Sequence, residues 1–252
     1  MTEISYQLYS SREFPPLTDT LGMLKQLGYS QVEGYGGLYD DLDLLKNAIS
    51  ESGLSMPSGH FGLDLLEDNP DGAIAIARAA GMRAVYCPHL ATNLRPTDAE
   101  GWRAFGGRLE KIGEPFRAAG LTFGWHNHDF EFAPLPDGTV PMEHILEGGP
   151  GLSWEADIAW IVRGGADPLD WISRHGNRIS AVHVKDIAPA GECIDEDGWA
   201  DVGHGTMDWN ELWTALRATP ANLFVMEHDK PNDDRRFASR SIEAVRKIAG
   251  ET

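Results

Sequence analysis

Four glycines, each after a helix-like stretch and before a short apolar run, limit the possible folds of this chain more than any other feature. They are Gly28, Gly53, Gly81 and Gly120. A glycine directly after a helix can adopt the left-handed conformation that closes the last turn. The apolar runs that follow, at residues 31–35, 54–59, 84–87 and 121–128, have the length of strands. This fourfold repeat predicts alternating helices and parallel strands, not hairpins.

The alternation continues along the rest of the chain. Apolar residues between Trp102 and Phe116 recur at steps of three and four, which predicts a helix with one buried face. Eight strands are expected, near residues 4–9, 31–35, 54–59, 84–87, 122–128, 152–157, 179–185 and 223–228. Eight βα units in 252 residues predict a single (β/α)8 TIM barrel domain over residues 1–252. A doubly wound sheet is the main competitor, but the sequence has no GxGxxG phosphate turn.

Charge and composition restrict the partners. Asp and Glu total 39 against 21 for Lys and Arg, so the formal net charge is −18. Such a field repels polyanions, which argues against nucleic acid and anionic membranes as partners. No stretch approaches 18 apolar residues, and the first residues do not resemble a signal peptide. The two cysteines, Cys87 and Cys193, fit a reducing compartment. We therefore expect a cytoplasmic protein with a small-molecule partner, and a homo-oligomer remains open.

Polar residues gather where five expected strands end. They include His60; His126, His128 and Glu131; Glu155 and Asp157; His183 and Lys185; and Glu227, His228, Asp229 and Lys230. In a (β/α)8 barrel these ends meet at one rim, where catalytic residues are placed. A lone histidine or carboxylate there is more often structural, but five polar strand ends together indicate a site. Mixed carboxylate and imidazole groups without thiolates suit one divalent ion, with Mn²⁺ favoured and Mg²⁺, Co²⁺ or Zn²⁺ as alternatives.

Several segments resemble one known family. They are residues 124–132 (GWHNHDFEF), 154–160 (WEADIAW), 183–186 (HVKD), 201–209 (DVGHGTMDW) and 225–229 (VMEHD). In this order they resemble the xylose isomerase-like TIM barrels, the sugar phosphate isomerase/epimerase superfamily that also includes endonuclease IV. Trp160 stands where endonuclease IV has a further metal-binding histidine. This departure and the negative charge argue against a nuclease.

The resemblance implies a ligand for the metal from each of three late strands. The family's ligands correspond to Asp157, His183 and Glu227 of this chain. Many relatives have Glu-Asn where this chain has His126-Asn127. Either His126 takes that position or Glu131, five residues later, supplies the carboxylate. We slightly favour Glu131, because isomerase chemistry requires a second carboxylate near the metal.

The resemblance also implies an activity. Glu131, Glu227 and His126 are the expected catalytic groups, and His60, His128, Lys185 and Lys230 are expected to contact a sugar or polyol substrate. A divalent ion would polarise a carbonyl and stabilise an enediolate, which predicts a sugar isomerase or epimerase. The same groups would support a lyase, such as an inosose-type dehydratase or an eliminase acting on keto sugars or glycosides. A non-catalytic sugar-binding barrel is the third possibility.

Overall fold

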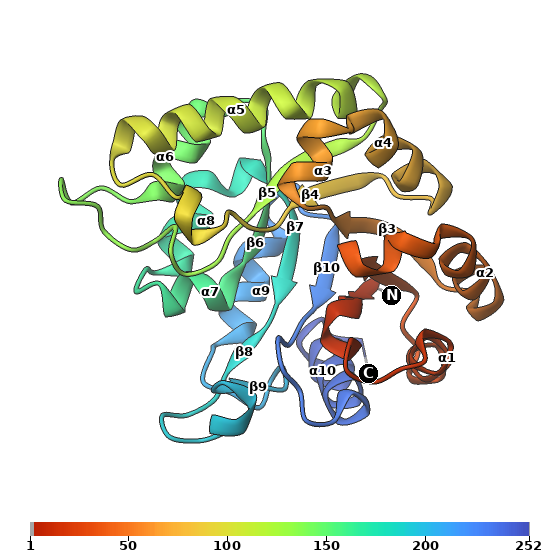
Figure 1. Cartoon of the computed structure of the whole chain (residues 1–252). Coiled ribbons are helices and arrows are strands. Elements are labelled where there is room, and N and C mark those ends of the chain that lie inside the picture. Colours follow the sequence, from red (N-terminus) through yellow and green to blue (C-terminus); the bar gives the residue numbers. More distant parts are fainter. Residues whose placement is uncertain (1–2, 252) are drawn as a thin grey trace.

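Eight parallel strands surrounded by helices form the core of the computed structural model, which describes residues 3–251 (Figure 1). The strands are β1 (Ile4–Tyr6), β2 (Gln31–Gly34), β3 (Ser55–His60), β4 (Ala84–Cys87), β5 (Thr122–His126), β6 (Ser153–Asp157), β7 (Ile179–Val184) and β10 (Leu223–Met226). Their order is β1-β10-β7-β6-β5-β4-β3-β2. A parallel bridge between Gln7 and Glu33 joins β1 to β2. The predicted (β/α)8 barrel is confirmed.

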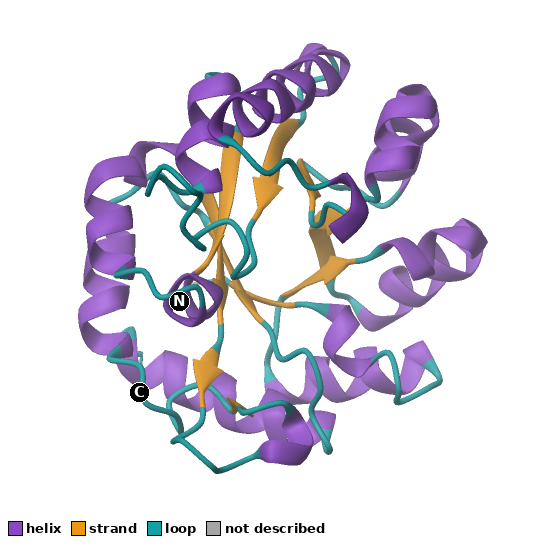
Figure 2. Ribbon diagram, turned by 60° about the vertical axis from the view of Figure 1, so that its left-hand side comes forward, coloured by secondary structure: helices purple, strands orange, loops and turns teal. Residues whose placement is uncertain are grey.

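Helices cover the outside of the strands (Figure 2). They are α1 (Leu17–Leu27), α2 (Leu42–Ser52), α3 (Leu63–Asp68), α4 (Pro70–Ala79), α5 (Ala99–Ala118), α6 (Pro141–Gly148), α7 (Ile158–Arg163), α8 (Pro168–His175), α9 (Trp209–Arg217) and α10 (Asp234–Ile248). Gly28 and Gly53 follow α1 and α2 with φ of 90° and 65°, the left-handed conformation expected at these positions. Within residues 3–251 no helix has the length and apolar character needed to span a membrane.

Several strands end earlier than the sequence predicts, among them β1 and β5. The chain leaves β1 after Tyr6, because the Gln7 side chain accepts a hydrogen bond from the Tyr9 backbone N–H and starts a 3-10 helix. It leaves β5 after His126, where Asn127 turns its side chain toward β6. The Asn127 Oδ1 atom accepts the Asp157 backbone N–H at 3.0 Å. At the ends of these two strands, side-chain hydrogen bonds of this kind replace the backbone hydrogen bonds between strands.

The segment from residue 188 to 205 contains part of a small antiparallel ribbon. Its strands are β8 (Asp186–Ile187) and β9 (Trp199–Ala200). The buried Asp186 carboxylate accepts backbone N–H groups from Gly203, Gly205 and Met207. These bonds fix the return of the chain to the barrel.

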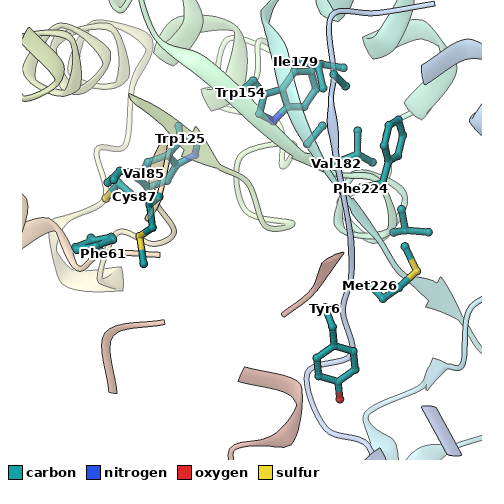
Figure 3. Close-up of a cluster of buried hydrophobic side chains, with 14 of the residues drawn as sticks. Tyr6, Phe61, Val85, Cys87, Trp125, Trp154, Ile179, Val182, Phe224 and Met226 are labelled. Atoms are coloured by element: carbon teal, nitrogen blue, oxygen red, sulfur yellow. The ribbon is translucent and has the colours of Figure 1, made fainter. Parts of the chain in front are cut away.

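The strands separate apolar from polar side chains. Trp125 packs on Phe105 of α5 and Trp154 on Trp171 of α8, and Figure 3 shows these tryptophans among the buried apolar residues. Residues that alternate with them, such as His126 and Glu155, face the barrel interior. The helix-facing layer is therefore apolar, whereas the interior at the carboxyl ends is strongly polar.

The contact between α5 and α6 depends on a glycine. A methyl group at Gly106 would collide with the Ile145 carbonyl oxygen, whereas one at Gly107 would lie 3.6 Å from the Gly148 oxygen. We predict that Gly106→Ala lowers the free energy of unfolding by about 1–3 kcal/mol through overpacking. The matched Gly107→Ala should raise it by about 0.5–1 kcal/mol because alanine favours a helix. Chemical denaturation would measure both, and equal effects would contradict the prediction.

Candidate metal centre

Four side chains converge at the carboxyl ends of β5, β6, β7 and β10. His126, Asp157, His183 and Glu227 each offer a ligand atom, and these atoms lie within 4.8 Å of one another. In the strand register, Asp157 on β6 lies beside His183 on β7. His183 also lies beside Val225 on β10, which is two residues before Glu227. Strand alternation therefore directs all three late residues to the barrel interior. We name this set the outer group.

The outer group has the properties of a metal site. The Asp157 Oδ1 atom accepts the Trp160 backbone N–H and caps α7. The buried Oδ2 atom has no hydrogen-bond partner, and its nearest cation is the Lys185 ammonium group at 3.6 Å. Such an atom is costly to bury, and a cation would satisfy it.

Burial, together with charge on His183, lowers the pKa of His126 to about 3, so its imidazole is neutral, as a metal ligand must be. Burial alone would lower the pKa of His183, but Glu155, Glu227 and Glu33 outweigh burial and raise it, so an ion would have to displace a proton from this ring. Two carboxylates and two imidazoles fit Zn²⁺ or Mn²⁺.

A second set lies deeper in the barrel and shares two histidines with the outer group. His60, His126, Glu155 and His183 also bring their ligand atoms within 4.8 Å of one another. The distance from His60 Nε2 to Glu155 Oε2 is 2.5 Å. Glu33 on β2 completes the layer, since its Oε1 atom accepts His183 Nε2–H at 2.7 Å. We call His60, Glu33 and Glu155 the inner layer.

Glu33 and Glu155 were not among the predicted site residues. Glu155 could have been found, since it precedes Asp157 by two positions and must face the same side. Glu33 could have been recognised as a carboxylate in the middle of an expected buried strand. Its partners come from β1, β3 and β7, and the sequence does not show these pairings.

Lys185 follows β7 and is fully buried. Its Nζ atom is 3.2 Å from Glu227 Oε2 and hydrogen-bonded to Asp229, and it lies 4.2 Å from the centre of the Trp199 ring. Burial alone would lower the pKa of Lys185, but Asp229 and Glu227 outweigh burial and raise it. The ammonium group therefore stays charged and holds both carboxylates in place.

A cavity of about 420 Å³ opens above the outer group. Its lining residues are Tyr9, Tyr35, Gly36, His60, Gly62, Pro88, His89, His126, His128, Glu227 and Asp229. Tyr9 and Tyr35 contact each other edge to face, with ring centres 5.3 Å apart. The cavity combines an aromatic wall with a polar floor, which suits a small ring-shaped polar molecule.

The sequence-predicted residues do not all meet there. His60, His126, His128 and Glu227 line the cavity, and Lys185 lies against Glu227. Lys230 instead pairs with Asp197 at 3.1 Å and does not line the cavity.

Glu131, the slightly favoured ligand from the fifth strand, belongs to neither metal-binding set. Its buried carboxylate accepts hydrogen bonds from Trp125 Nε1–H at 3.0 Å and from the His128 backbone N–H at 2.8 Å. Trp125 faces the helices, so Glu131 lies on that side of β5 and supports the loop that carries His128.

Comparison with known proteins places the chain in a family. Residues 21–248 match the family described as xylose isomerase-like TIM barrel. The chain belongs to this family.

Solved structures similar to the chain show its fold. A sugar phosphate isomerase/epimerase from Parabacteroides distasonis has a TM-score of 0.80 at 20% identity, covering 98% of this chain and 94% of the other. The probable 3-DHS dehydratase AsbF from Bacillus anthracis has a TM-score of 0.77 at 14% identity, with 97% and 98% covered. IolI, solved with a zinc atom, has a TM-score of 0.76 at 14% identity, with 99% of both chains covered.

One curated relative is similar in sequence. The rhizopine catabolism protein MocC of Rhizobium meliloti is 24% identical over 193 residues, which cover 68% of this chain. The match spans 58% of the length of MocC.

The environment of Glu131 predicts a pH effect on stability. Burial raises its pKa to about 8, although the His128 N–H opposes the shift. The ordinary pKa of a glutamate side chain is 4.5, so between pH 4.5 and about pH 8 Glu131 loses its proton in the unfolded chain but keeps it in the folded chain. The contribution of Glu131 to stability is thus complete below the ordinary pKa and is lost as pH rises through the folded pKa.

We predict that the free energy of unfolding of wild type, relative to Glu131→Gln, falls with rising pH across this window. The slope should reach up to about 1.4 kcal/mol per pH unit, because glutamine does not titrate. Urea denaturation of both proteins with a chelator present would measure it. A difference independent of pH would contradict the assignment.

Proposed function

We propose that this protein is a divalent-metal-dependent isomerase or epimerase acting on a ketose or a related polyol. The observation that carries the proposal is the outer group beneath a cavity with an aromatic wall. His126, Asp157, His183 and Glu227 would hold the ion, which when bound supplies a Lewis acid for the substrate carbonyl. Relatives described as isomerase/epimerase and the zinc-containing IolI support this proposal.

We assign the ligand from β5 to His126 and not to Glu131. The neutral His126 imidazole faces the other three ligands, whereas both Glu131 oxygens accept N–H groups on the far side of the strand. Glu131 then acts in support: by holding the His128 backbone, it fixes the loop that places the His128 imidazole on the cavity wall.

Proton transfer requires groups that line the cavity, and Asp229 and His128 are two such groups outside the outer group. Asp229 follows β10, and burial raises its pKa although Lys185 opposes the shift. His128 follows β5, and burial lowers its pKa well below the usual range, so it is neutral. We propose that Asp229 removes a proton beside the carbonyl, and that His128 hydrogen-bonds a substrate hydroxyl. A base with a raised pKa is better matched to neutral pH.

The alternative is a lyase on the same scaffold, acting on an inosose or another keto sugar. The cavity-lining Asp229 would also serve this reaction, because an elimination needs a proton donor for the departing hydroxyl, and the carboxyl group that removed the first proton can return it there. Similarity to AsbF is consistent with dehydration.

Product analysis separates the two reactions. We predict that ketohexoses or keto-inositols give products with the mass of the substrate, that a chelator stops turnover, and that Mn²⁺ restores it. Mass spectrometry and NMR of the products would measure this. A product lighter by one water would establish the lyase, and full turnover after removal of the metal would refute the metal requirement.

The ligand assignment has its own test. We predict that Asp157→Ala, Glu227→Ala and His126→Ala each weaken metal binding by more than about 100-fold, beyond the loss usual for outer-shell partners. Asp129→Ala, which removes an exposed carboxylate of the same loop, should bind metal like wild type. Elemental analysis and competition titration would measure the affinities. Retained metal in His126→Ala, with loss in Glu131→Gln, would return the role to Glu131.

A further inference from the structure

Both histidines of the outer group direct their second ring nitrogen at a buried carboxylate. His183 Nε2 lies 2.7 Å from Glu33 Oε1, and His126 Nδ1 lies 3.2 Å from Glu155 Oε2. The two nitrogens of an imidazole have different roles, since in the neutral ring one carries a hydrogen and the other a lone pair.

The carboxylates therefore select the nitrogen that faces the metal site. An ionised carboxylate only accepts hydrogen bonds, so the ring nitrogen facing it carries the hydrogen. His183 Nδ1 also faces a carboxylate, because it lies 2.9 Å from Glu227 Oε2, and it donates a hydrogen bond there. An ion in the outer group would replace that hydrogen, and Glu33 would keep the other hydrogen on Nε2, so that the lone pair lies on Nδ1. The contact between His126 Nδ1 and Glu155 Oε2 is an ion-pair distance without a hydrogen bond, so Glu155 orients this ring through charge.

We propose that Glu33 and Glu155 are positioning residues that fix the tautomer and orientation of His183 and His126 for metal binding. This inference rests on the proposed function, because it requires an ion in the outer group. Both carboxylates are fully buried and neither lines the cavity, so they act through the histidines and not on the substrate. Carboxylate–histidine–metal arrangements of this kind make the histidine a stronger ligand.

The inner layer is itself held rigidly. Glu33 accepts a hydrogen bond from Gln7 Nε2 at 2.8 Å and from Ser58 Oγ at 2.5 Å. His60 lies between the two carboxylates, with its Nε2 atom 2.5 Å from Glu155 Oε2 and 3.4 Å from Glu33 Oε1. The carboxylates thus have fixed directions, which a positioning role requires.

A second ion in the inner layer is the competing explanation, since His60, His126, Glu155 and His183 also have converging ligand atoms. The distances favour positioning: the Glu155 Oε2 and His183 Nε2 atoms are already engaged at 2.5 and 2.7 Å. The number of ions bound by wild type distinguishes the two.

The test compares Glu33→Gln and Glu155→Gln with Ser58→Ala. Glutamine keeps the size of glutamate but removes the negative charge through which a carboxylate orients a histidine and makes it a stronger ligand. Ser58→Ala removes one bond to Glu33 but leaves the carboxylate and its contact with His183. Zn²⁺ and Co²⁺ competition titrations measure affinity, the visible spectrum of the Co²⁺ form reports the histidine ligands, and thermal unfolding of the metal-free proteins reports folding.

We expect wild type to bind one ion and both glutamine variants to bind it about 10–100-fold more weakly, with an altered Co²⁺ spectrum. Ser58→Ala should stay close to wild type in both measurements. If affinity and spectrum are unchanged in both glutamine variants, the positioning role is overturned but the proposed function is not. The same holds if wild type binds two ions and Glu155→Gln binds only one. If wild type binds no ion, the proposed function is overturned as well. If one glutamine variant fails to fold, the other decides.

Discussion

The hydrogen bonds of His183 to carboxylates on both sides are the interaction on which the site depends. Its ring lies between Glu33 at 2.7 Å and Glu227 at 2.9 Å, fully buried. A buried charge without a partner costs several kcal/mol, so these groups are tolerable only when paired. Their partners come from distant parts of the chain, since 150 residues separate Glu33 from His183. The site therefore forms only when the barrel closes, and the closed barrel supplies its geometry.

Strand alternation is the constraint that makes such a site compatible with a stable core. Trp125 and Trp154 point toward the helices and supply apolar burial, while their neighbours His126 and Glu155 point inward. One strand thus contributes to both layers, and a shift of one residue would exchange them. This explains how a barrel can keep so many titratable groups inside without losing its hydrophobic layer.

The sequence was sufficient for the fold because its signals are local. Gly28 and Gly53 mark helix ends by their conformational freedom, and the structure places both in the left-handed region. The site was harder to predict, because its pairings are not local. Alternation predicts the direction of His126, which lies inside a strand, but not that of Glu131, which follows the strand on a loop. The role of Glu33 could not be predicted, because its partners lie on other strands and the sequence does not show which strands lie beside β2.

A histidine at the end of β5 also makes sense in the charge balance of the barrel. In the proposed site, Asp157 and Glu227 would offset the two charges of a divalent ion, and Lys185 pairs with Asp229 as well as with these two carboxylates. Beneath them, Glu33 and Glu155 share His60. A third carboxylate among the ligands would place another negative charge in this buried region with no cation to offset it. The neutral His126 supplies a ligand atom without that charge, and Glu155 behind it orients the ring. The histidine at this position thus belongs with the two carboxylates of the inner layer.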